Sequence, residues 1–277
     1  MIKLNLFLYS NMIKNLYIYC DNYVYRFTKE YIISINQKLK AKIIHNLNEN
    51  INLENDIIIF IQKLPNIEIT NKNNNIFILN TEQLTRKKWL KKILIYSKKF
   101  KIIDYSKENI DILKKNKLKN VIYFPYIYNK KEIYNFKKTK DICGISLYNM
   151  PRRRRIINSP KFKKLKIDII EGWDKKRDEI LFKYKILVNL SGSSNYNIFE
   201  SIRCYRCLFN KMIVISDIKY NKNLIDYNNH MLFVKIEEMP DLIKKVIDNY
   251  DYYYTKLDID NVNIKLNNHL ISKSILK

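Results

Sequence analysis

The stretch NIFESIRCYRCLFNKMIVISD, residues 197–217, joins a helix-length segment to a short apolar run that ends in an acid. Glu200 stands on the first turn of the expected helix, and Arg203 follows one turn later on the same face. The run MIVISD, 212–217, is typical of a strand that is buried on both faces of a sheet. The stretch therefore predicts a helix–strand unit of an α/β protein, with a charged pair at the start of the helix.

The same alternation of strand and helix extends through the rest of the chain. Short apolar runs predict strands at 55–64, 75–80, 101–106, 120–128, 140–148, 166–172, 185–192, 212–217 and 230–235. Helical spacing of apolar residues predicts helices at 85–100, 107–118, 151–158, 175–183, 198–210 and 238–254. Continuous apolar strands that alternate with helices indicate parallel sheets flanked by helices on both faces.

The run 128–140 has no strong apolar face and separates the strands into two series. We therefore expect an α/β protein with two Rossmann-like domains, residues 1–128 and 129–277, that face a cleft. Ligands of such sheets bind beyond the carboxyl ends of the strands, so we expect the functional site in that cleft.

The composition limits the classes of partner. The 277 residues carry 52 basic and 27 acidic side chains, a formal net charge of +25 that invites a nucleic-acid interpretation. However, Lys, Asn, Ile and Tyr are all over-used and Gly occurs only three times, so the charge reflects compositional bias. We expect no specific nucleic-acid partner, and the basic surface leaves a peripheral membrane contact open.

The cysteines and the N-terminal residues favour a cytoplasmic setting. Four scattered cysteines are too few for a disulfide framework in a chain of this size. The sequence has no apolar run long enough to span a membrane. Residues 1–20 look like a signal peptide, but polar residues interrupt the apolar run and no small-residue cleavage site follows, so we expect a first strand and its neighbour.

Five features of the C-terminal half occur in an order that resembles the C-terminal domain of GT-B glycosyltransferases. They resemble most closely the short group 1-like members of bacteria and large DNA viruses, over roughly residues 118–250. The features are the strand with Gly144 before the basic run 152–155, the Gly–Trp turn with Lys-Arg-Asp at 172–178, the KILVN strand at 185–189, the helix with Glu200 and Arg203, and the strand that ends in Ser216-Asp217. For a viral protein, the cytoplasmic setting would be that of the host cell.

The resemblance implies a nucleotide-sugar site in this domain, with no tightly bound metal and no other cofactor. Glu200 would contact the ribose, Arg203 would buttress Glu200 or reach a phosphate, and the basic run would face the diphosphate in place of a divalent cation. The implied donor-binding residues are Gly144, Arg152, Arg153, Arg154, Arg155, Trp173, Gly192, Ser193, Glu200 and Arg203.

Each of these assignments has a structural alternative. Glu200 could merely complement the helix dipole, the four arginines could form a solvated helix end, and Trp173 could be a packed loop anchor. The sequence also departs from the family. Gly192 stands where many members carry a second glutamate, and Asn210 is expected to take the left-handed turn position after the helix.

The N-terminal half offers two candidates for the catalytic base that would activate a hydroxyl of a glycan, lipid or protein acceptor. Glu82 follows a predicted strand and could act as the base or as a ligand of the acceptor hydroxyl. The alternative is a helix N-cap at Thr81 with Glu82 as a first-turn acid. His45 is the second candidate base, with a structural role as its alternative.

The sequence lacks the motifs that indicate an NTPase, a dehydrogenase, a hydrolase or a metal site. The sequence has no phosphate-cradling GxxxxGK[ST] loop, no GxGxxG turn and no GxSxG elbow, and Cys204-x-x-Cys207 has no second metal-binding pair. We therefore predict a metal-independent glycosyltransferase that moves a sugar from a nucleotide donor to an acceptor hydroxyl. The alternatives are a degenerate, non-catalytic relative that binds a glycan or a partner, and a basic nucleic-acid-binding protein.

Overall fold

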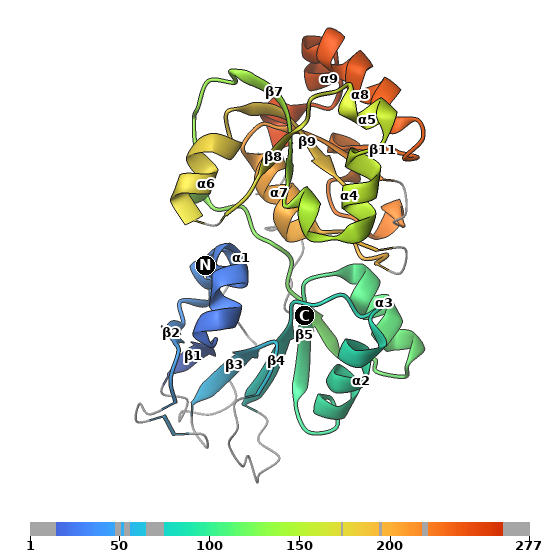
Figure 1. The fold of residues 1–277 in the computed structure, drawn as a ribbon. Helices are drawn as coiled ribbons and strands as arrows, with labels where there is room; N and C mark the ends of the chain where they lie inside the picture. The colour runs from blue at the N-terminus through green and yellow to red at the C-terminus, as the bar shows by residue number, and fades with distance from the viewer. Residues whose placement is uncertain are drawn as a thin grey trace. The chain divides into compact units, whose positions relative to one another are not determined.

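The computed structural model describes residues 15–47, 51–52, 56–64, 75–172, 174–193, 196–217 and 221–262. These residues fall into two compact units, of which the first runs to Ile127 and the second begins at Tyr128. Each unit contains one parallel sheet with helices packed around it (Figure 1). The α/β fold with two parallel sheets that the sequence predicts is confirmed.

The N-terminal unit is a six-stranded sheet with the strand order β2-β1-β3-β4-β5-β6. Its strands are β1 Leu16–Tyr19, β2 Lys42–Ile44, β3 Ile57–Ile61, β4 Ile76–Asn80, β5 Lys101–Asp104 and β6 Val121–Tyr123. Its helices are α1 Asn22–Leu39, α2 Lys87–Tyr96 and α3 Lys107–Lys115. Every residue of β3 and β4 is buried, which explains their continuous apolar sequences.

Helix α1 is an element that the sequence analysis did not assign. Asp21 caps its N-terminus, since the side chain accepts a hydrogen bond of 2.9 Å from the Val24 amide. The helix buries Tyr31, Ile32 and Ile35 against the sheet. Aromatic and β-branched residues have modest helix propensity, so tertiary packing rather than local preference holds this segment as a helix.

The C-terminal unit is a five-stranded sheet with the strand order β11-β10-β9-β7-β8. Its strands are β7 Lys140–Ile145, β8 Asp168–Ile170, β9 Tyr184–Asn189, β10 Ile213–Asp217 and β11 Leu232–Val234. Its helices are α4 Pro151–Ile157, α5 Pro160–Lys163, α6 Asp174–Leu181, α7 Ser201–Phe209, α8 Met239–Asp248 and α9 Tyr250–Lys256. The prediction of a single helix at 238–254 is wrong. The chain leaves helical geometry at Asn249, where φ is −129°, and two helices, α8 and α9, occupy this range.

Both sheets share one topological constraint. The first strand of each unit lies between the second and the third strand, so β7 is flanked by β8 and β9, as β1 is flanked by β2 and β3. The chain therefore leaves the first and the third strand toward opposite edges of the sheet, which makes the carboxyl ends of these two strands a topological switch point. In parallel α/β sheets this switch point is the preferred place for a ligand.

The run that was expected to link the domains belongs to the C-terminal unit, and Asn210 holds it. The Asn210 side chain accepts a hydrogen bond of 2.7 Å from the Tyr134 amide and donates one of 3.0 Å to the Glu132 carbonyl. Lys138 donates from Nζ to the carbonyls of Phe182 and Asn210, and burial lowers the pKa of its ammonium to about 8. These bonds bind the run 132–138 to helix α7 and its neighbours.

The expectation that Asn210 takes the left-handed turn position is wrong. Its φ is −89°, and Lys211, with φ of 60°, occupies the left-handed region instead. Asn116 and Lys117 repeat this arrangement after α3, with φ of −90° and 66°. Each asparagine also donates to a carbonyl four residues earlier. Only Asn210 is buried and bonded to a distant segment, so the backbone conformation that it shares with Asn116 does not depend on that contact.

We expect Asn210→Ala to lower the free energy of unfolding by about 2–4 kcal/mol, because it leaves the part-buried Tyr134 amide and Glu132 carbonyl without this partner. Asn116→Ala removes the matching side chain from an exposed helix end and should cost less than about 1 kcal/mol. Urea denaturation of both variants measures the difference. Equal losses would show that the bonds to 132–134 add nothing to stability.

Candidate functional site

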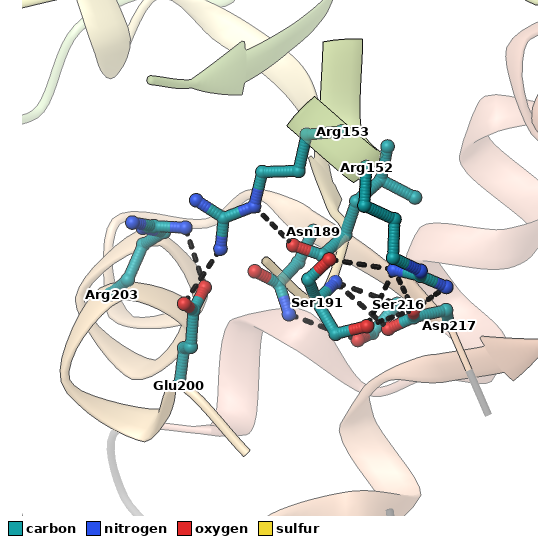
Figure 2. A network of polar contacts seen from close by, with 9 residues as sticks. Arg152, Arg153, Asn189, Ser191, Glu200, Arg203, Ser216 and Asp217 are labelled. Atoms are coloured by element: carbon teal, nitrogen blue, oxygen red, sulfur yellow. Dashed lines mark hydrogen bonds and ion pairs between the residues drawn. The ribbon is translucent and has the colours of Figure 1, made fainter. Parts of the chain in front are cut away.

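The candidate site lies at the switch point of the C-terminal sheet, beyond the carboxyl ends of β7 and β9. The chain after β7 enters helix α4 at Pro151, whereas the chain after β9 runs through Leu190 and Ser191 to helix α7. Side chains from α4 cross to the loop after β9, and the end of the neighbouring strand β10 supplies Asp217 (Figure 2).

The first polar group joins Arg153, Glu200 and Arg203. Arg153 is only 4% exposed, and its guanidinium donates to the Leu190 carbonyl at 2.6 Å and to Glu200 Oε1 at 2.7 Å. Arg203 donates to the other oxygen, Oε2, at 2.5 Å. Figure 2 shows the Glu200 carboxylate between the two guanidinium groups. The expected pairing of Arg203 with Glu200 is present, and Arg153 is a second partner that the sequence did not reveal.

Glu200 occupies the N-cap position of α7 rather than its first turn, since the helix begins at Ser201. Its side chain makes no capping hydrogen bond to the helix, and a carboxylate at this position still complements the helix dipole, as the structural alternative expects. The two arginines also compensate the carboxylate and fix its orientation.

The second polar group joins Arg152, Ser191 and Asp217. Arg152 donates to the Ser191 carbonyl and hydroxyl, both at 2.6 Å, and approaches Asp217 Oδ2 at 3.2 Å. The Ser191 hydroxyl donates to the same carboxylate at 2.7 Å. Asp217 is 1% exposed, so its charge depends on Arg152 for compensation. The sequence analysis does not include Ser191 or Asp217 among the expected site residues. For Asp217, the available signal was its position at the end of the predicted strand 212–217.

The four consecutive arginines do not act as one surface. Arg152 and Arg153 turn toward the two polar groups, whereas Arg154 and Arg155 are exposed. Arg154 donates to the Tyr148 carbonyl at 2.9 Å, and Arg155 makes no side-chain hydrogen bond or ion pair with any residue that the structure describes. Successive residues of a helix point in directions about 100° apart, which explains the split.

Close packing of neighbouring side chains explains why glycine occupies positions 144 and 192. A Cβ atom on Gly144 would overlap the buried side chain of Leu147, so β7 needs glycine there. A Cβ atom on Gly192 would lie 3.3 Å from side-chain atoms of both Met150 and Tyr196. Ser193 is half-buried and its carbonyl accepts a hydrogen bond from the Tyr196 amide, whereas Trp173 lies outside the described residues.

The Lys-Arg-Asp feature that contributed to the family resemblance has a structural role in this unit. Asp178 accepts hydrogen bonds from Arg206 at 2.5 and 2.6 Å and from Arg177 at 2.7 Å, and all three residues are buried. Arg206 also pairs with Glu132 at 2.6 Å. This network ties α6 and α7 to the run after Asn129.

In the N-terminal unit, Glu82 lies beyond the carboxyl end of β4. Its carboxylate accepts hydrogen bonds from Gln62 at 2.8 Å and from Arg86 at 2.7 Å. Burial raises the pKa of the Glu82 carboxyl, and the Arg86 guanidinium opposes part of that shift. The alternative of a helix N-cap at Thr81 is wrong, because α2 begins at Lys87.

A buried amide–acid group positions the loop that carries Glu82. Asn80 and Asn109 donate to the Glu82 carbonyl at 2.8 and 2.9 Å and to the two oxygens of Asp104 at 2.7 and 3.0 Å. Burial raises the pKa of Asp104 to about 7, while hydrogen bonds from Asn80, Ser106 and Asn109 act in the opposite direction. The Glu82 backbone is thus fixed by side chains from β4 and α3.

His45, the second candidate base, does not join Glu82. His45 follows β2, whereas Glu82 follows β4, and β1 and β3 lie between these two strands. At about 4.8 Å per strand, the two residues are roughly 14 Å apart. The Nδ1 atom of His45 lies 2.7 Å from the Cys20 carbonyl, so this nitrogen carries the proton and Nε2 is the acceptor in the neutral ring. The ring also packs on Tyr25.

No group of three or more His, Cys, Asp or Glu side chains that could hold a metal ion occurs within the described ranges. Cys204 and Cys207 are free thiols buried in helix α7. In the same part of the chain, no helix combines the length and apolar character needed to cross a membrane.

The chain has relatives among proteins of Acanthamoeba polyphaga mimivirus. Uncharacterized protein L138 is 32% identical over 259 residues, which cover 83% of this chain and 28% of L138. Uncharacterized protein L140 is 30% identical over 253 residues, which cover 85% of this chain and 81% of L140. The chain therefore spans less than a third of L138 but most of L140. No family model matches the chain.

Two solved structures share the fold. T4 phage BGT, solved in complex with UDP and Mn2+, has a TM-score of 0.53 and 15% identity, with 94% of this chain and 99% of that chain covered. WaaG, a glycosyltransferase involved in lipopolysaccharide biosynthesis, has a TM-score of 0.54 and 8% identity, with 94% and 96% covered. At these identities the likeness concerns the fold, which is that of the GT-B glycosyltransferases.

We expect Arg153→Ala to lower the free energy of unfolding by about 2–4 kcal/mol, because the substitution leaves Glu200 with one partner and removes a buried hydrogen bond to Leu190. Arg154→Ala, at the next and exposed position, should change it by less than about 0.5 kcal/mol. Urea denaturation measures both. A small loss for Arg153→Ala would mean that the buried guanidinium does not hold the two loops together.

Proposed function

We propose that this chain, which belongs to the same family as uncharacterized protein L140 of Acanthamoeba polyphaga mimivirus, is a glycosyltransferase that uses a nucleotide-sugar donor. The observation that carries the proposal is the Glu200 carboxylate, held between Arg153 and Arg203 at the switch point of a parallel sheet. The fold of WaaG, a glycosyltransferase, and of T4 phage BGT, which was solved with UDP, supports the same activity. The group 1-like features of the sequence add to this support.

In this proposal Glu200 binds the ribose of the donor. An ionised carboxylate has about four acceptor positions, of which the arginines use two, so two remain for the paired hydroxyls of a ribose. Glu200 is 18% exposed, which leaves one side of the group open to a ligand. The neighbouring Ser201 hydroxyl is buried and has no hydrogen-bond partner among the described residues, and a bound nucleotide or water would relieve that cost.

The diphosphate of the donor would then meet positive charge from two elements. Arg152 and Arg203 are 20% and 24% exposed and can reach a ligand, whereas Arg153 is buried and acts by positioning Glu200. The exposed Arg154 and Arg155 add charge at longer range. Guanidinium groups stabilise a departing diphosphate electrostatically, so we propose that donor binding needs no metal ion.

Activation of the acceptor falls to the N-terminal unit. Glu82 is our candidate base, because its loop is fixed by buried amides and burial raises the pKa of its carboxyl toward the range useful for proton transfer. His45 offers Nε2 as an alternative acceptor of the proton. The acceptor itself is a hydroxyl of a glycan, a lipid or a protein.

A non-catalytic, glycan- or partner-binding relative is the second candidate, and Gly192 favours it. The family's additional glutamate is missing at this position, and even a Cβ atom there would press on Met150 and Tyr196. The loop is therefore built for a small residue, and any contact that an acid would make with the sugar must come from another residue.

A thermal-shift panel with UDP, GDP, CDP, ADP and dTDP tests the proposal, with and without Mg2+ or Mn2+. A nucleotide at about 100 times its dissociation constant should stabilise the chain by about 2.7 kcal/mol without metal. We expect Glu200→Gln to weaken the binding of that nucleotide about 10- to 100-fold, since the amide accepts fewer hydrogen bonds from a ribose.

Glu238→Gln is the matched control, because Glu238 is also an N-cap residue without a side-chain capping bond, on helix α8. It should leave nucleotide binding unchanged. No shift from any nucleotide would favour the non-catalytic relative, and equal binding by the wild type and Glu200→Gln would refute the role of Glu200. A shift that requires metal would refute metal independence alone.

A further inference from the structure

The strand β8 is followed by a carboxylate that the proposed function does not yet use. Glu171 comes directly after β8, which lies on the opposite side of β7 from β9. Its side chain is exposed, and its Oε2 atom accepts a hydrogen bond of 3.1 Å from the Ser146 hydroxyl at the end of β7. Glu171 therefore presents a negative charge beside the switch point, and no lysine or arginine among the described residues pairs with it.

The end of β7 holds this carboxylate in place. Ser146 has a φ of 50°, in the left-handed region that residues other than glycine seldom adopt. In this conformation its amide donates to the Ile170 carbonyl at 3.0 Å, while its hydroxyl donates to Glu171. Strained residues of this kind cluster at ligand-binding sites. Ser146 is buried and Glu171 is exposed, so the acid is anchored through one oxygen and open to a ligand at the other.

The turn after β8 leaves room for a ligand next to Glu171. Gly172 has a φ of 93°, and a Cβ atom on it would meet no atom within 4 Å apart from those of its chain neighbours. An ionised carboxylate has about four acceptor positions, of which Ser146 uses one. Glu171 can therefore accept further hydrogen bonds from a ligand that approaches through this space.

The strand order places Glu171 on the side where the base of the donor would lie. In the proposed function the diphosphate meets Arg152, which bonds to Ser191 after β9 and to Asp217 at the end of β10, and the ribose meets Glu200. The base and the phosphates leave a ribose at opposite ends, and the order β10-β9-β7-β8 puts β8 on the far side of the site from β10. At about 4.8 Å per strand, β8 is roughly 10 Å from β9, which a base and the Glu171 side chain can bridge together.

We infer that Glu171 binds the Watson–Crick edge of the donor base and selects guanine, so that the donor is a GDP-sugar. The inference rests on the proposed transferase function, which does not specify the base. A carboxylate only accepts hydrogen bonds, and guanine offers two adjacent donors, N1–H and the N2 amino group. Uracil and thymine offer one N–H between two carbonyls, and adenine and cytosine offer an amino group beside a ring nitrogen with a lone pair. With these four bases the second carboxylate oxygen has no donor to bind, which weakens the contact.

Calorimetric titration of the full chain with GDP, IDP, UDP, CDP and ADP tests this selectivity. GDP should bind about 10- to 100-fold more tightly than UDP, CDP or ADP, the discrimination typical of a two-bond contact with a base edge. IDP keeps N1–H and lacks the N2 amino group, so it should bind about tenfold more weakly than GDP.

Glu171→Gln should weaken the binding of GDP about 10- to 100-fold and remove most of the difference between GDP and IDP. The reason is that an amide presents one acceptor and one donor in place of two acceptors. UDP and ADP, whose edges offer a donor next to an acceptor, should bind the variant at least as tightly as the wild type. The substitution changes an exposed side chain and should keep the wild-type melting temperature.

Glu179→Gln is the matched control, since it removes the same charge from an exposed position of helix α6, which follows β8. It should leave all five dissociation constants unchanged. Tighter binding of another nucleotide than of GDP, in a manner that depends on Glu200, would overturn this inference and leave the transferase proposal standing. A ratio of GDP to IDP affinity that Glu171→Gln does not change would do the same, as would equal effects of the two substitutions. No binding of any nucleotide would overturn the proposed function and this inference together.

Discussion

The buried guanidinium of Arg153 is the constraint around which the candidate site is arranged. A buried cation is tolerated only when it is paired and hydrogen-bonded, and Arg153 meets this need with the Leu190 carbonyl and Glu200. One side chain thereby ties helix α4, which follows β7, to the loop and helix that follow β9. The two segments leave the sheet in opposite directions, and this contact, together with the bonds from Arg152 to Ser191, holds them together at the switch point.

The same need to compensate a buried charge explains the position of the neighbouring Arg152. Asp217 at the end of β10 is almost fully buried, and Arg152 with Ser191 supplies its compensation. The two neighbouring arginines thus form ion pairs with opposite patterns of burial. In one pair the arginine, Arg153, is buried and the acid is part-exposed, and in the other the acid, Asp217, is buried and the arginine is part-exposed. The part-exposed members, Glu200 and Arg152, are the residues that our proposal assigns to a ribose and a phosphate.

Much of the fold could be predicted from the sequence, because buried parallel strands are continuous apolar runs. β3, β4, β9 and β10 are clear for that reason, and so is the alternation with helices. Helix α1 could not be predicted locally, since its buried positions are aromatic and β-branched and its stability comes from packing. The break at Asn249 is likewise invisible to apolar spacing, which continues from α8 into α9.

The site was predictable only in part, for a related reason. The spacing of Glu200 and Arg203 is local and gives their ion pair directly. The partnerships of Arg153 with Glu200 and of Arg152 with Asp217 join residues 47 and 65 positions apart, and only the strand order brings them together. Asn210 shows the same limit, because its hydrogen bond with the distant Tyr134 amide cannot be inferred from its own turn propensity.

The most direct measurement is a crystal structure of the chain with each of the five nucleoside diphosphates soaked in. We predict one nucleotide beyond the carboxyl ends of β7 and β9, with its ribose hydroxyls within 3.2 Å of the Glu200 carboxylate and its phosphates next to Arg152 or Arg203. A nucleotide bound at any other place, or bound here with its ribose away from Glu200, would show that this is not the donor site.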